Sequence, residues 1–169
     1  MKKAVEDILS HGMALLEDCS IDAYTRVHPT MFGATIGQHY RHVIDHFLCL
    51  AGAMITMEVA YDERNRSLAL ETDLNHARTV TQMLLRFFQT MSKQELERPC
   101  RVISALDYTD QKSVTVESNF ARELAYCISH AVHHFAIVRL MCADVSVQVP
   151  AEFGIAPSTL RHRRAALAH

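Results

Sequence analysis

Four long segments of the chain repeat apolar residues with the 3.6-residue period of an amphipathic α-helix, and this repetition constrains the fold most strongly. They run from about Lys3 to Cys19, Thr35 to Tyr61, Leu70 to Met91, and Asn119 to Asp144. The second segment is apolar on more than one side, which is typical of a central helix. The sequence therefore predicts an all-α fold, a four-helix bundle.

Polar residues at the segment boundaries predict where the helices begin. Thr35 and Gln38 have the spacing of a capping box, in which each side chain binds the other residue's backbone N–H group. Ser92 is expected to cap a further short turn, and Ser118 is expected to cap the last long helix. The residues between the first two helices, Ser20–Ala34, are expected to form a loop.

The helical period is lost between Cys100 and Glu117. Apolar residues lean towards alternation at the start of this region, and residues 113–116 are rich in β-branched side chains. Polar residues 107–112 lie between the two halves. We expect a small β-hairpin or an extended crossover here, before the last long helix.

The chain is expected to form one domain over residues 1–145, with an irregular extension at 146–169 packed on it or trailing from it. A single short helix after Pro157 fits that extension. A chain of 169 residues can bury a sufficient core without disulfide bonds or a structural metal.

Composition points to a cytoplasmic protein without a membrane or nucleic-acid partner. No apolar run approaches the roughly 18–20 residues of a membrane span, and the charged N-terminus does not resemble a signal peptide. The five cysteines are an odd number without a CxxC pair, which predicts reduced and mostly buried thiols. The net charge is −2, and the basic cluster Arg161–Arg164 is interpreted as a short solvated tail.

The chain contains eleven histidines, and their spacing suggests a metal site. His130 and His134 lie one helical turn apart on the last long helix, so both imidazoles can reach one ion. His133 points about 100° away from His134 and is expected to be exposed.

The second long helix carries three further histidines on one face, His39, His42 and His46. Two helices that present such faces to each other could supply three imidazoles and an open coordination position, as in catalytic zinc sites. The competing interpretation is a set of imidazoles that make ordinary hydrogen bonds. Position 131 is alanine, so the pair is not the HExxH motif of a metalloprotease.

Two segments of the chain resemble the histidine motifs of the DinB/YfiT-like superfamily. They are Ile36-Gly37-Gln38-His39-Tyr40-Arg41-His42-Val43 and Ser129-His130-Ala131-Val132-His133-His134. The resemblance covers roughly residues 5–145. It implies a divalent ion, zinc or nickel, held by His42, His130 and His134, with His46 and His39 as rival ligands or as partners that orient the ligand. Relatives also suggest a homodimer.

The resemblance implies a metal-dependent transferase or hydrolase that activates a thiol or water against a small electrophile. Some relatives are thiol S-transferases, so a low-molecular-weight thiol is a candidate cofactor. The alternative is a non-catalytic metal- or ligand-binding stress protein.

Two acids and two arginines are candidates for a role beside the metal. Glu123 and Asp45 are the candidate catalytic acid–base groups, and Arg64 or Arg66 could bind an anionic substrate. In the alternative interpretation, both acids are surface groups or partners of the nearby arginines at positions 41 and 122. Residues 62–66 are then a solvated turn.

Overall fold

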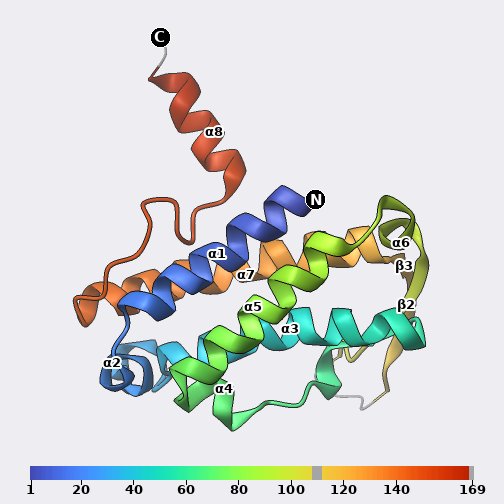
Figure 1. The fold of residues 1–169 in the computed structure, drawn as a ribbon. Helices are drawn as coiled ribbons and strands as arrows, with labels where there is room; N and C mark the ends of the chain where they lie inside the picture. The colour runs from blue at the N-terminus through green and yellow to red at the C-terminus, as the bar shows by residue number, and fades with distance from the viewer. Residues whose placement is uncertain (108–111, 168–169) are drawn as a thin grey trace.

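The computed structural model describes residues 1–107 and 112–167, and they form a mostly helical structure with one small sheet (Figure 1). The helices are α1 (Lys2–Asp18), α2 (Ile21–Thr25), α3 (Ile36–Thr56), α4 (Leu68–Thr72), α5 (Leu74–Thr90), α6 (Lys93–Glu97), α7 (Phe120–Asp144) and α8 (Pro157–Ala166). Two 3-10 helices, η1 (Pro29–Met31) and η2 (Tyr61–Glu63), lie in the connections.

The long helices α1, α3, α5 and α7 form the body of the molecule, in which α3 packs on α7 and α1 packs on α5. Their apolar faces meet in one core that includes seven fully buried aromatic side chains. These are Tyr24, Tyr40, Phe47, Phe88, Phe120, Phe135 and Phe153. None of the described helices is long and apolar enough to cross a membrane.

A three-stranded sheet lies at one end of the long helices, next to α6 (Figure 1). Its strands are β1 (Glu58–Ala60), β2 (Pro99–Ser104) and β3 (Val114–Asn119), in the order β1-β2-β3. β2 and β3 are antiparallel with Val102 opposite Val116, so the predicted hairpin is confirmed. Part of its predicted connection, residues 108–111, lies outside the described residues.

The second long helix ends earlier than predicted, at Thr56 rather than Tyr61. Met57 adopts a left-handed conformation with φ 62°, which stops the helix, and the next three residues pair in parallel with β2. This pairing joins residues more than 40 positions apart in sequence. The local periodicity of the sequence therefore could not predict this strand pairing.

The third predicted helix is divided in two at Asp73. Its carboxylate accepts hydrogen bonds from the backbone N–H groups of Asn75 and His76 and so caps α5. Its own N–H group donates to the carbonyl of Ala69 and closes α4. Asp73 therefore ends one helix and begins the next, because a short carboxylate competes well for free amides at a helix N-terminus.

Two of the three predicted helix caps are confirmed, and one is wrong. The predicted capping box at Thr35 and the predicted cap at Ser92 are confirmed, and Ser92 also forms a capping box with Glu95. The cap of α7 was assigned to the wrong residue, because the side chain of Asn119 accepts the Arg122 N–H group while the hydroxyl of Ser118 donates to Glu123. The region predicted as a loop after α1 contains the short helix α2.

The residues after α7 return to its surface before α8 begins. The ring of Phe153 stacks on Phe135 of α7 with 4.5 Å between centroids. Gly154 has φ 69°, and a Cβ atom there would lie 2.5 Å from the backbone nitrogen of Ala136, so this close approach requires glycine. Beyond it, α8 runs away from the body of the molecule (Figure 1).

Candidate metal centre

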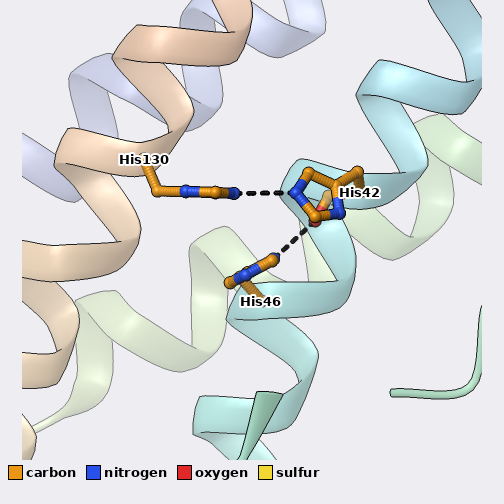
Figure 2. Close-up of side chains that lie close together, drawn as sticks. All are labelled: His42, His46 and His130. Carbon is orange, nitrogen blue, oxygen red and sulfur yellow. Dashed lines mark hydrogen bonds between the residues drawn. The ribbon is translucent and has the colours of Figure 1, made fainter. Parts of the chain in front are cut away.

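Three histidines from two neighbouring helices point toward one another at the interface between α3 and α7, and His46 is buried while His42 and His130 are partly buried (Figure 2). His42 and His46 lie one turn apart on α3, and His130 faces them from α7. One nitrogen from each ring can be chosen so that all three lie within 4.8 Å of one another. The cluster joins residues separated by more than 80 positions in sequence.

Hydrogen bonds hold these rings in place. The Nε2 atoms of His42 and His130 lie 2.9 Å apart. Nδ1 of His46 lies 2.7 Å from the carbonyl oxygen of His42, an oxygen that can only accept, so Nδ1 carries the proton. The Nε2 atom of His46 therefore keeps its lone pair and is free to bind an ion.

Two more histidines extend the cluster along the same interface. The ring of His134 lies 4.4 Å from that of His42 and 4.6 Å from that of His130, measured between centroids. Its Nδ1 atom lies 3.0 Å from Nδ1 of His39. The structure thus brings all five candidate ligands together, although His134 is not one of the three whose nitrogens lie within 4.8 Å. His133 is exposed, as predicted.

The environment of the cluster favours neutral imidazoles. Burial lowers the pKa of His42 to about 2, helped by the neighbouring imidazoles. Burial likewise lowers the pKa of His130 to about 4 and that of His134 to about 3, and it lowers the pKa of His46. Neutral imidazole is the form that binds a metal, and an ion bound to both His42 and His130 would displace the one proton that lies between their Nε2 atoms.

The donor set fits a divalent transition metal. Imidazole suits zinc, nickel and copper, whereas magnesium and calcium prefer oxygen ligands. Because zinc–imidazole bonds measure about 2.0–2.1 Å, two ligands of one ion lie roughly 3–4 Å apart. The 2.9 Å separation of the His42 and His130 nitrogens and the compact triangle with His46 come close to this geometry.

Asp45 lies inside the protein next to the cluster, contrary to the interpretation of this residue as a surface acid. Its side chain is 1% exposed, and its Oδ2 atom lies 3.7 Å from Nε of Arg41. Burial raises the pKa of Asp45, while Arg41, Arg64 and Arg66 oppose that rise. The alternative that paired Asp45 with Arg41 therefore agrees with the geometry.

Glu123 is also buried, and its exposure is 1%. Its carboxylate accepts hydrogen bonds from the hydroxyl groups of Tyr61 at 2.9 Å and Ser118 at 2.6 Å, and from Arg122 at 3.0 Å. The Tyr61 ring in turn stacks on His46, with 5.1 Å between centroids. Glu123 is thus linked to the cluster through Tyr61, and the partner expected for it at position 122 is present.

Sequence reasoning missed two tyrosines that border the cluster. Tyr126 lies 5.6 Å from His130 between ring centroids, and it precedes His130 by one helical turn. The spacing 126, 130 and 134 could have identified Tyr126 as part of the same helix face. Tyr61 was predicted as the last residue of the second long helix but lies on η2, so the helical period gave the wrong position for it.

The four cysteines at positions 19, 100, 127 and 142 are buried, and Cys49 is half-buried; all five are free thiols. Burial raises the pKa of Cys127 to about 12, so its thiol stays protonated at neutral pH. Its sulfur lies 3.6 Å from the Tyr61 hydroxyl, beside the histidines. This environment does not suit a nucleophilic cysteine.

Comparisons with known proteins concern the family and the fold of the chain. A family model described as the DinB superfamily matches residues 12–138. The crystal structure of the DinB-like protein YjoA from Bacillus subtilis has a similar fold, with a TM-score of 0.64 and 20% sequence identity over 89% of this chain and 98% of that one. At this identity the likeness concerns the fold alone.

A relative from Rhizopus delemar, FK506-binding protein 5, is 33% identical over 113 residues. The aligned region is 67% of this chain but 29% of the relative. The aligned part of the chain therefore spans less than a third of the length of that protein.

Proposed function

This chain belongs to the DinB superfamily, and we propose that its histidine cluster binds a divalent transition metal that activates a thiol or water for transfer to a small electrophile. In this proposal the long helices α1, α3, α5 and α7 form the four-helix bundle of the family. The observation that carries it is the convergence of neutral imidazoles from α3 and α7.

His42 and His130 are ligands in every arrangement that we consider. Geometry favours His46 as the third ligand, because its Nε2 atom keeps its lone pair and its Nδ1–H group donates to a backbone carbonyl. Metal-bound histidines commonly donate their second N–H group in this way, and the bond orients the ring. The family motif instead implies His134, whose ring lies next to both of the other ligands.

A divalent ion in this position lowers the pKa of a bound thiol or water and so supplies a nucleophile at neutral pH. The surrounding side chains orient the ligands and limit the access of water. Tyr61 covers one face of His46 and is held by Glu123, so we assign Glu123 a positioning role. Asp45 is buried beside the partly exposed Arg41, and the positive charge of Arg64 acts on His42.

The proximity of His134 favours a second candidate function. If His42, His46, His130 and His134 all bound one ion, a tetrahedral site would have no open position. Such a centre would be structural or would store the metal, without catalysis. The number of ligands therefore separates the two functions.

The first experiment is metal analysis of the untagged protein after loading with zinc, nickel or cobalt. We expect one ion per chain in the wild type and little in His130→Ala, while His133→Ala serves as the matched control because its ring is exposed on the same helix. Equal metal content in His130→Ala and His133→Ala would reject the site.

The second experiment tests catalysis on the cobalt-loaded protein. Tetrahedral and five-coordinate cobalt have different visible spectra, and an open position should respond to added azide or to a small thiol. A spectrum that changes with thiol, together with metal-dependent conjugation of that thiol to 1-chloro-2,4-dinitrobenzene, supports the enzyme. A spectrum that neither ligand alters supports the closed, non-catalytic centre.

A further inference from the structure

Two pockets stand out in the described part of the chain, and they lie on different sides of α7. The larger, about 770 Å³, is bordered by α1 and α8 and by Ile128 and Val132 of α7. These residues are each two positions from His130, about 200° around the helix, so this pocket lies on the side turned away from the histidines.

The smaller pocket, about 270 Å³, lies between the β2–β3 hairpin and the first turns of α7. Its lining is drawn from η2, the hairpin and α7. The lining residues are Tyr61, Val102, Ser104, Leu106, Val114, Val116, Glu117, Ser118, Arg122, Glu123 and Tyr126. It is smaller than the roughly 300–1,000 Å³ of sites for drug-sized molecules, so it suits a single small ring.

Tyr61 and Tyr126 connect this pocket to the histidine cluster, because each ring belongs to both. The Tyr126 ring lies 5.6 Å from His130 and 6.2 Å from His46 between centroids. The Tyr61 ring stacks on His46 and lies 5.2 Å from Tyr126. A molecule in the pocket would therefore be one aromatic ring away from the imidazoles.

The chemistry of the walls favours an uncharged apolar occupant. The hairpin contributes four aliphatic side chains, and the two tyrosines offer flat faces for a ring. The carboxylate of Glu123 is already bound by three donors, so it does not require a cation. Arg122 and Glu117 both line the pocket, and Arg122 is paired with Glu123, so the lining as a whole favours neither sign of charge on a ligand.

We propose that this pocket binds an uncharged, ring-sized apolar group of the molecule on which the metal centre acts. The proposal rests on the proposed function, since it assigns a substrate class to the same site. Electrophiles with one aromatic or alicyclic ring would then be the substrate class, with the reactive atom extending past Tyr126 toward the histidines.

Binding of 4-fluorobenzyl alcohol, followed by fluorine NMR, tests the pocket. We expect saturable line broadening with metal-free and zinc-loaded protein. Weaker binding is expected for 4-fluorobenzoate and 4-fluorobenzylamine, which carry opposite charges on the same ring. In the cobalt-loaded protein the paramagnetic ion should also shorten the fluorine relaxation time of the bound alcohol.

Neighbouring residues of β3 provide matched variants. Val116 lines the pocket opposite Val102, whereas Thr115 pairs with Ile103 and does not line it. Successive side chains of a strand point to opposite faces of the sheet. Thr115→Lys therefore adds the same charge as Val116→Lys, but on the face of β3 that does not line the pocket. Val116 is 50% exposed, so a lysine there keeps its charge in solvent while its longer side chain occupies part of the pocket. We expect Val116→Lys to weaken binding by at least about tenfold and Thr115→Lys to leave it unchanged.

The possible outcomes distinguish a failure of the pocket proposal from a failure of the metal site. Metal content and helical content should match the wild type in both variants, so that a change in binding is assigned to the pocket. Equal weakening by the two variants, stronger binding of either charged probe, or binding without any cobalt effect would overturn the inference. Probe binding by a wild-type protein that takes up no zinc or cobalt even after loading would reject the proposed function and would leave the pocket without a substrate role.

Discussion

The Nδ1 atoms of His39 and His134 lie 3.0 Å apart, so one of these rings donates its proton to the other. If His134 donates, its Nε2 atom keeps a lone pair and can bind an ion. If His39 donates, Nε2 of His134 carries the proton and cannot. The direction of one hydrogen bond between α3 and α7 therefore decides whether His134 is available as a ligand.

His46→Ala and His134→Ala separate the two candidate third ligands. We expect the His46 substitution to weaken cobalt or zinc binding more, because only the His46 nitrogen lies within 4.8 Å of those of both His42 and His130. A group that only orients a ligand typically changes metal affinity by about 10–100-fold, and the loss of a ligand should exceed this. Competition with a chelator of known affinity measures both constants, with His133→Ala as the control. A larger loss in His134→Ala would assign His134 as the third ligand.

The metal-free protein should lose stability as the pH falls below about 6.5, the ordinary pKa of histidine. Burial lowers the pKa of His42 to about 2 and that of His130 to about 4 in the folded chain. The unfolded chain therefore takes up protons that the folded chain does not, and the free energy of unfolding decreases as pH falls from 6.5 toward 4. Above pH 7 both states are neutral, and these groups add no pH dependence.

Urea denaturation at a series of pH values measures this effect, and a double variant isolates it. In His42→Gln with His130→Gln the decrease between pH 6.5 and 4 should be shallower than in the wild type. The same slope in both proteins would mean that other groups, such as the buried acids, cause the acid sensitivity.

Tyr61→Phe should destabilise the protein because it removes a hydrogen-bond donor from a buried carboxylate. Glu123 is 1% exposed and would retain only Ser118 and Arg122 as partners. The expected loss is about 1–3 kcal/mol of the free energy of unfolding, measured by urea denaturation. Tyr126→Phe removes a hydroxyl group from a partly exposed neighbour and should change stability by less than about 0.5 kcal/mol. Equal effects of the two substitutions would contradict the role of the Tyr61–Glu123 bond.

Two glycines of α3 should respond to alanine in opposite directions. A Cβ atom on Gly37 would lie 2.2 Å from the backbone oxygen of Glu71, so Gly37→Ala must push α4 away from α3. We expect a loss of about 1–3 kcal/mol, the usual cost of overpacking. Gly52 has no atom within 4 Å of the same position, so Gly52→Ala should stabilise the helix by up to about 1 kcal/mol. Thermal or urea unfolding of both variants provides the test, and stabilisation by Gly37→Ala would show that α4 does not contact α3 closely.

The local sequence was sufficient to predict the four long helices, apart from the end of α3 and the start of α5, and the faces on which their histidines lie. Each residue of an α-helix turns by about 100°, so the spacing of His39, His42 and His46 placed them on one side of α3 before any packing was known. The capping box at Thr35 and the hairpin before α7 also depend on residues close in sequence, and both were predicted. The resemblance of the two histidine motifs likewise indicated the DinB superfamily.

Only the tertiary structure decided how these faces meet. The packing of α3 on α7 sets the 2.9 Å between His42 and His130, and the parallel pairing of β1 with β2 ends α3 early. That early end leaves room for η2, which carries Tyr61 to His46 and Glu123. Such contacts join residues far apart in the chain, and they depend on which surfaces bury each other rather than on local backbone preferences. For the same reason the burial of Asp45 and Glu123 could not be read from their neighbours in sequence.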